Sequence, residues 1–274
     1  MRRWWPQAAR VTNAMTLFGL KKMHPTRPDS SKGNLLLGAL HAEERHLVEA
    51  DLEWMALPRD QLLYERGSRQ RHIYFPVTAT VSLVSSMADG TNTEVAVVGN
   101  EGVVGVCAFM GGGPALSSAV VQAEGYAWRM SSAAILRHTQ RSPAVLTTLL
   151  GYTQFLLTHL AQTSACNQHH ALEQQMCRWL LLHMDRQPGD ELQVTQEHIA
   201  SMLGVRREGI TGAALRLKKD GLIRYHRGRI AITDRKGLEA RCCECYAVIS
   251  LAAAVVPPPN RMVSGRTDRR LAMA

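Results

Sequence analysis

The sequence predicts an α+β protein in which a jelly-roll-like β-domain comes first, a long helix follows, and a winged helix-turn-helix comes last. Three observations support this order. Residues 58–129 alternate short β-prone runs with turn residues. Pro143 begins a long stretch with apolar residues at helical spacing. Residues 193–234 combine two short amphipathic helices with a basic hairpin.

The length and the charge distribution fit this arrangement. A chain of 274 residues is long enough for two domains. Its net charge of +9 is uneven: residues 1–33 carry +6, residues 34–187 carry −3 and residues 188–241 carry +4. The middle of the chain is therefore the poorer candidate for contacting nucleic acid.

The N-terminal residues 1–33 are expected to form a flexible basic extension. They lack the apolar core and cleavage site of a signal peptide, and Met15 or Met23 is an alternative start. The six cysteines do not make a secreted disulfide framework in a chain this long. We therefore expect a cytoplasmic protein.

Residues 34–141 are expected to form the β-domain. Residues 34–57 should be helical and precede the strands. A cupin-like metalloenzyme barrel is the alternative, but it needs paired histidines, and His72 is the only histidine within 58–130. We therefore do not expect an enzyme. The β-prone runs are His72–Phe75, Val81–Met87, Glu94–Val98 and Ala119–Gln122.

Residues 142–187 are expected to hold the long helix and a second helix over 172–186. The long helix has apolar positions at alternating spacings of three and four residues, which is the pattern of a coiled-coil seam. The seam either packs on the β-domain or joins two copies of the chain, and we favour the homodimer. No apolar run of about 18 residues occurs, so no membrane span is expected. The seam residues are Leu146, Leu149, Thr153, Leu156, Leu160 and Thr163.

Residues 188–246 carry the helix-turn-helix. Thr195 is a suitable N-cap for the first helix, and Gly204 is suited to end it in a left-handed conformation. The second helix begins at Arg206 and stops at Asp220-Gly221. Between residues 206 and 229 there are eight Lys or Arg against two acids, a balance that favours a phosphate backbone.

A helix-turn-helix places its second helix in the major groove of double-stranded DNA. A pair of amphipathic helices with solvated charges, or a protein-interaction module, would leave the basic helix and hairpin unexplained. The candidate DNA contacts are Thr195, Gln196, Arg206, Arg207, Glu208, Thr211, Arg216, Lys218, Arg227 and Arg229.

The order of these parts resembles the Crp/Fnr family of bacterial transcription regulators. The resemblance covers about residues 34–246 and is strongest in Gly204-Val205-Arg206-Arg207-Glu208 and in Leu217-Lys218-Lys219-Asp220-Gly221-Leu222-Ile223. It implies a cyclic-nucleotide-binding-type β-roll as a sensor domain and a homodimer that binds a palindromic site. It also implies RNA polymerase as a partner.

The resemblance implies that Arg207 and Glu208 read base edges. Arginine can bond guanine O6 and N7, and glutamate can accept a hydrogen bond from cytosine N4. The family often has another arginine where this chain has Gly212. The operator sequence of this chain is therefore expected to differ from the best-known operator of the family.

The expected effector site departs from the family pattern. Residues 102–118 lack the glutamate and the arginine that hold the ribose and the cyclic phosphate. This argues against cyclic AMP, because the phosphate would lose a charge-assisted bond. The β-roll then either binds an unidentified neutral or apolar effector or is vestigial, its glycines only making turns. Candidate pocket residues are Gly102, Gly105, Ser117 and Ser118.

The C-terminal cysteines raise the question of a metal. On a helix, Cys242 and Cys245 would share a face, but a closed zinc or iron–sulfur site needs four ligands. His169-His170 would contribute only if the fold brought them near. We expect free thiols and no metal. Residues 247–274 are expected to be a tail that begins with the end of a packed helix.

Overall fold

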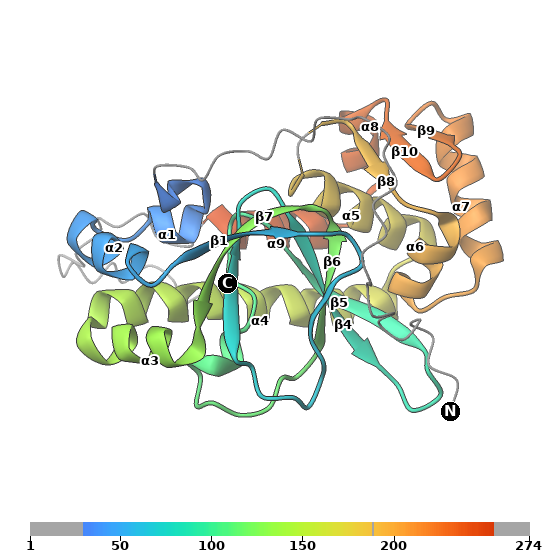
Figure 1. Cartoon of the computed structure of the whole chain (residues 1–274). Helices are drawn as coiled ribbons and strands as arrows, with labels where there is room; N and C mark the ends of the chain where they lie inside the picture. The colour runs from blue at the N-terminus through green and yellow to red at the C-terminus, as the bar shows by residue number, and fades with distance from the viewer. Residues whose placement is uncertain (1–29, 188, 255–274) are drawn as a thin grey trace, which may run out of the picture.

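The computed structural model describes residues 30–187 and 189–254 of the chain. A β-domain (residues 53–131) lies in the middle, two helices within residues 132–169 run across it, and a winged domain (residues 191–241) lies at one end (Figure 1). Most of the predicted N-terminal extension and of the predicted C-terminal tail lies outside the described residues. The predicted α+β order is confirmed.

The β-domain is built from two antiparallel sheets whose inner faces form the main core. The first sheet has the order β1-β7-β3, and the second has the order β2-β6-β4-β5. The four predicted runs coincide with strands β3, β4, β5 and β6, except that Met87 lies just beyond the end of β4. The strands are β1 (Glu53–Leu57), β2 (Leu62–Tyr64), β3 (His72–Pro76), β4 (Thr80–Ser86), β5 (Asn92–Val98), β6 (Ser118–Ala123) and β7 (Gly125–Ser131).

The predicted helix over residues 34–57 is wrong in its second half. The segment forms two short helices, α1 (Leu35–Gly38) and α2 (Ala42–Glu49), and then enters strand β1. Trp54 of β1 stacks on Tyr126 of β7 with a ring-centroid distance of 5.3 Å. Pairing with a distant strand therefore overrides the local helical pattern.

The helices that follow the β-domain are α3 (Ser132–Arg141), α4 (Pro143–His169) and α5 (Leu172–Met184). The Ser142 side chain caps α4 by accepting a hydrogen bond from the Val145 amide, and Pro143 occupies the first turn as predicted. Tyr152 and Phe155 of α4 are buried in the core of the β-domain.

Helix α4 is also the one helix among the described residues that is long and apolar enough to cross a membrane, although the sequence analysis expected none. However, 39% of its most apolar window is buried inside the protein. Packing against the β-domain and against α9 (Glu244–Ala254) accounts for the buried part of its apolar composition.

The structure places the predicted seam of α4 differently from expectation. Leu149, Thr153, Leu156 and Thr163 are at most 5% exposed and pack within the chain, while Leu146 and Leu160 are partly buried. The exposed row lies one residue further along and includes Leu150 and Leu157, at 47% and 56% exposure. Because leucines stand side by side at 149–150 and 156–157, the spacing could not decide which row faces the β-domain.

The winged domain contains the predicted helix-turn-helix, α6 (Gln196–Leu203) and α7 (Arg207–Lys219). Its small sheet has the order β8-β10-β9, in which β8 (Glu191–Gln193) pairs with β10 (Arg229–Ile232) and β10 pairs with β9 (Ile223–His226). Strand β8 was not predicted from the sequence. Helices α8 (Arg235–Arg241) and α9 follow, and α9 crosses the predicted boundary at residue 246 to pack on α4.

Candidate nucleic-acid interface

The turn between α6 and α7 is fixed by its two ends. Thr195 Oγ1 accepts a hydrogen bond from the His198 amide at 3.1 Å, so the predicted N-cap of α6 is confirmed. Gly204 ends α6 with a φ of 66°, and a Cβ there would lie 2.8 Å from Thr93 Oγ1 of the β-domain. Glycine is therefore required both by the left-handed conformation and by the close approach.

Helix α7 has one buried face and one exposed face. Ile210, Ala214 and Leu217 are buried as predicted, in a core shared with α5 and α6. Arg206 is the extended residue before the helix, and the helix itself begins at Arg207. The helix lies at the outer edge of the molecule, away from the β-domain (Figure 1). Its exposed candidates for DNA contact are Arg206, Arg207, Glu208, Arg216 and Lys218.

Two of the predicted DNA contacts join the helices to each other. Thr211 Oγ1 lies 2.8 Å from Gln196 Oε1, and both residues are only half-exposed. The Thr211 hydroxyl also lies 3.1 Å from the Arg207 carbonyl oxygen. This pair fixes the position of α6 relative to α7 and so sets the direction of the exposed arginines.

Arg216 is held by the connecting helix α5. Its Nε donates to Glu173 Oε2 at 2.6 Å, and Arg241 Nη1 donates to Glu173 Oε1 at 2.8 Å. Burial raises the pKa of Glu173, but the hydrogen bonds from Arg216 and Arg241 outweigh it and lower the pKa overall. Arg216 therefore anchors α7 to α5, a role that the sequence analysis did not anticipate.

The basic wing turns at Arg227 and Gly228, both of which have positive φ angles, 45° and 77°. Arg227 and Arg229 are exposed, and Arg229 Nη1 lies 3.7 Å from Glu191 Oε2 of β8. Arg224 on β9 is also exposed, although the sequence analysis did not select it. The alternation of β9 places it outward, opposite to the buried Ile223.

The four predicted effector residues lie in different surroundings. Gly102 is buried against α4, and a Cβ there would lie 2.2 Å from the Tyr152 ring. Gly105 has a φ of 108° and begins a short 3-10 helix, as expected of a turn glycine. The Ser118 hydroxyl accepts a hydrogen bond from the Arg66 amide at 3.0 Å, and Ser117 is half-exposed. Tyr152 therefore occupies the space beside Gly102.

A cleft of about 780 Å³ lies elsewhere, between the β-domain and the winged domain. Tyr126 lines it from the β-domain, Trp179 and His183 line it from α5, and Val194 lines it from the winged domain. Arg59 Nη2 donates to the Gln193 carbonyl oxygen at 2.5 Å across this junction. None of the predicted effector residues lines the cleft.

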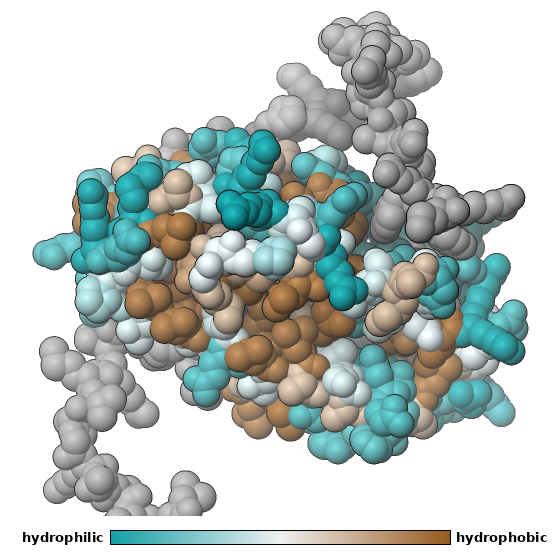
Figure 2. All heavy atoms as spheres, turned by 90° about the horizontal axis from the view of Figure 1, so that it is seen from below, coloured by the Kyte–Doolittle hydropathy of each residue, from teal (hydrophilic) through white to brown (hydrophobic). Residues whose placement is uncertain are grey.

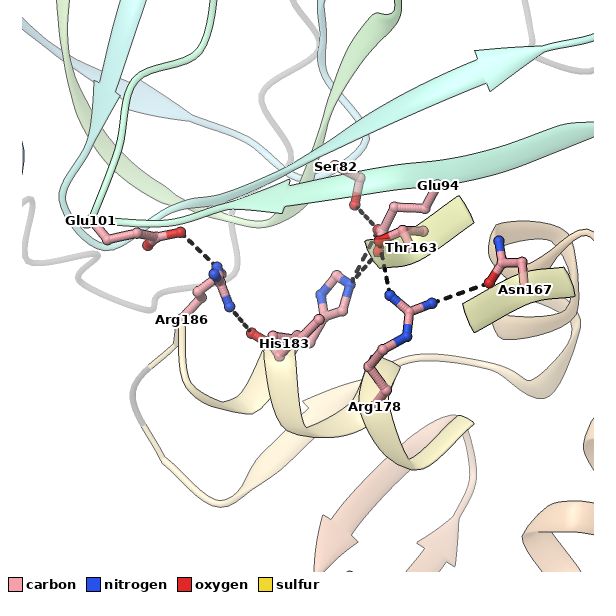
Figure 3. A network of polar contacts seen from close by, with 9 residues as sticks. Ser82, Glu94, Glu101, Thr163, Asn167, Arg178, His183 and Arg186 are labelled. Atoms are coloured by element: carbon pink, nitrogen blue, oxygen red, sulfur yellow. Dashed lines mark hydrogen bonds and ion pairs between the residues drawn. The ribbon is translucent and has the colours of Figure 1, made fainter. Parts of the chain in front are cut away.

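A buried polar network also joins α5 to the β-domain (Figure 3). His183 Nε2 lies 3.0 Å from Glu94 Oε1, and the Ser82 hydroxyl donates to Glu94 Oε2 at 2.5 Å. Arg186 Nε donates to Glu101 Oε1 at 2.7 Å. These contacts fix the end of α5, and therefore the base of the winged domain, against the second sheet.

Two family models match the chain. Residues 54–142 match a cyclic nucleotide-binding domain, and residues 174–241 match a Crp-like helix-turn-helix domain. The chain belongs to the Crp/Fnr family. This Crp/Fnr protein is accordingly a DNA-binding transcription regulator, and members of the family are not enzymes.

Solved structures share the fold of this Crp/Fnr regulator. FixK2 from Bradyrhizobium japonicum has a TM-score of 0.60 at 18% identity, with 70% of this chain and 98% of FixK2 covered. A CRP-family transcriptional regulator from Thermus thermophilus has a TM-score of 0.58 at 21% identity, with 68% and 95% covered. The c-di-GMP-responsive regulator CLP from Xanthomonas campestris has a TM-score of 0.57 at 16% identity, with 70% and 99% covered. No curated protein sequence matches the chain.

Proposed function

We propose that this Crp/Fnr regulator acts in the cytoplasm as a homodimer on a palindromic operator and works together with RNA polymerase. The observation that carries the proposal is the exposed start of α7, where Arg206, Arg207 and Glu208 stand free of the core. Two copies of such a helix are needed to read two half-sites one turn of DNA apart.

Within this proposal, Arg207 and Glu208 read base edges, and Lys218 and the wing arginines contact phosphates. The Arg207 side chain is 64% exposed, and within the described part of the chain it forms one loose ion pair, with 3.7 Å between Arg207 Nε and Glu197 Oε2. Such a side chain can turn toward a base at little cost. Arg216 does not read bases; its hydrogen bond to Glu173 holds α7 in position against α5.

The exposed row of α4 is the proposed dimer contact. Leu150 and Leu157 are seven residues apart on the same face of a 27-residue helix, which is the spacing of a coiled coil. Apolar side chains also gather on the face of the molecule that is seen from below, as Figure 2 shows. Exposed leucines at this spacing are typical of a helix that meets a second copy of itself.

For the sensor domain we favour a regulator that does not bind cyclic AMP. Residues 102–118 carry no arginine for the cyclic phosphate, and Tyr152 fills the space beside Gly102. Gating by another effector and a vestigial sensor domain both remain compatible with this arrangement. A shift in melting temperature on adding candidate effectors separates the two.

The proposal is tested by selecting bound duplexes from a random DNA pool with the purified full-length protein. We expect enrichment of one sequence with inverted half-sites about one helical turn apart. Recovery of a pool without any preferred sequence would overturn the proposal. If the enriched sequence contains one half-site without an inverted copy, sequence-specific DNA binding would be supported and the homodimer would be rejected.

A further inference from the structure

Four metal-ligating side chains meet where α4 ends and α9 begins. They are Cys166 in the last turns of α4, His170 directly after α4, Cys243 directly before α9, and Cys245 in the first turn of α9. One donor atom from each of the four lies within 4.8 Å of each of the others. Cys166 Sγ lies 3.6 Å from Cys243 Sγ, and Cys245 Sγ lies 3.3 Å from His170 Nδ1.

We propose that these four residues bind one zinc ion in a tetrahedral structural site. Three cysteines and one histidine form a donor set that zinc prefers, and a structural zinc site is closed by four protein ligands. With bonds of roughly 2.3 Å to sulfur and 2.0 Å to nitrogen, tetrahedral ligands lie roughly 3.5–3.8 Å apart. The distances of 3.6 Å and 3.3 Å are close to this spacing. An iron–sulfur cluster would need its ligands further apart.

The surroundings of the four ligands suit a bound metal. His170 Nε2 lies 3.3 Å from Glu244 Oε1, so this carboxylate fixes the ring with Nδ1 toward the thiols. Gln162 Nε2 donates to Cys245 Sγ at 3.1 Å. Cys166 and Cys245 are fully buried. These partners orient the ligands in the way that outer contacts orient a zinc site.

The charge of the proposed site is also compensated. Each cysteine gives up its proton to solvent on binding, so one Zn²⁺ with three thiolates carries one net negative charge. The Arg178 guanidinium is 3% exposed and donates to Asn167 Oδ1 at 3.2 Å, next to Cys166 in the chain. A buried cation beside the cluster lowers the cost of a buried anionic site.

The site would connect two parts of the chain that carry different functions. Cys166 and Cys243 are 77 residues apart, and the segment between them contains α5 and the whole winged domain. A metal that closes so long a loop stabilises the fold, because the unfolded chain loses more freedom than the folded one. The zinc would therefore hold the DNA-binding domain at a set position relative to α4.

Cys242 supplies a matched control. The sequence analysis expected Cys242 and Cys245 on one helical face, but Cys242 lies just after α8 and outside both helices. Its Sγ lies 3.9 Å from the Gln174 carbonyl oxygen of α5, and the side chain packs beside the cluster without being one of the four ligands. A Cys242→Ser variant therefore removes a neighbouring thiol without removing a ligand. The expectation of free thiols at Cys166, Cys243 and Cys245 is replaced by this proposal.

The test measures zinc in the full-length protein, purified under reducing conditions after growth with zinc. Mass spectrometry of the metal content is expected to find one zinc per chain in the wild type and in Cys242→Ser. Cys166→Ser and Cys245→Ser are expected to lose it. His170→Cys is expected to keep it, since a four-cysteine site also binds zinc. Zinc absent from the wild type, or retained in the serine variants, would overturn the proposal.

Cobalt provides a second measurement that does not depend on the folding of the variants. Co²⁺ added to the metal-free wild type should give the absorption of a tetrahedral ion and thiolate-to-cobalt charge-transfer bands. Octahedral cobalt spectra, an iron–sulfur chromophore in the isolated protein, or a Cys166–Cys243 disulfide in the reduced sample would contradict it. No DNA enters these measurements, so their outcome is independent of the proposed operator.

Discussion

His183 on α5 and Glu94 on β5 form a buried pair, with 3.0 Å between His183 Nε2 and Glu94 Oε1 and exposures of 2% and 7%. The Ser82 hydroxyl contacts the second carboxylate oxygen of Glu94. The pair lies between the β-domain and the helix that leads to the winged domain (Figure 3). Moving α5 away from the β-domain would therefore leave the Glu94 carboxylate without its buried partner.

We expect Glu94→Ala to lower the free energy of unfolding by about 3 kcal/mol. This is the lower end of the cost of breaking a buried pair. Urea denaturation of wild type and variant measures the change. Glu53→Ala, which removes the exposed partner of Arg129, serves as the control and should change stability little. If both variants lowered the free energy of unfolding equally, the stabilising role of the buried pair would be contradicted.

The same pair predicts a dependence on acid. Burial raises the pKa of Glu94, but the charge and hydrogen bond of His183 and the hydrogen bond of Ser82 outweigh it and hold the pKa below 4.5. The stabilisation is thus present above that pH and is lost as the pH falls through the folded-state pKa. We expect the stability gap between wild type and Glu94→Gln to be largest near neutral pH and to shrink below about pH 4.5. A gap that stays constant down to pH 3 would contradict this assignment.

The winged domain was predictable because its signals are local. Thr195 caps α6, Gly204 ends it, and Asp220-Gly221 ends α7, all within one short segment. Such signals depend on neighbouring residues and hardly on the rest of the fold. The long helix α4 was predictable for the same reason, from Ser142 and Pro143 at its start.

The features that were not predicted depend on contacts between distant residues. Strand β1 forms because Trp54 meets Tyr126, 72 positions away, and β8 forms because Leu192 meets Ile230. The predicted seam residues Leu149 and Leu156 of α4 are covered because contacts with the β-domain decide which leucines are buried. The gathering of Cys166 with Cys243 likewise requires α9 to return to α4. Spacing along the chain does not contain this information.

The two neighbouring rows of α4 can be told apart by substitution. Leu150→Asp is expected to convert the proposed homodimer to a monomer, because it places a charge on the exposed row. The unfolding temperature of the subunit should stay near that of the wild type. Leu149→Ala should instead lower the free energy of unfolding by about 2–5 kcal/mol, since this leucine is buried in the core. Analytical ultracentrifugation and urea denaturation measure the two effects. A dimer that survives Leu150→Asp would place the contact elsewhere.

Arg207→Ala tests base reading by α7. We expect binding to the selected operator to weaken by about 1–3 kcal/mol and one base position to lose its preference, because the arginine stands exposed at the helix start. Competition between the operator and single-base variants measures both quantities. If the variant loses the same affinity for random DNA as for the operator, Arg207 contacts the backbone and does not read sequence.

Lys218→Ala tests a phosphate contact at the other end of the same helix. Lys218 is exposed in the last turn of α7, next to the exposed Lys219. A lysine that neutralises a phosphate releases a counterion, so its removal should reduce the slope of log affinity against log salt by about 1. The loss of affinity should be similar for all operator variants, in contrast to Arg207→Ala. Lys32 is exposed in the short 3-10 helix Ser31–Gly33 that precedes α1, and Lys32→Ala should leave the slope unchanged. An unchanged slope in Lys218→Ala would place this side chain off the DNA.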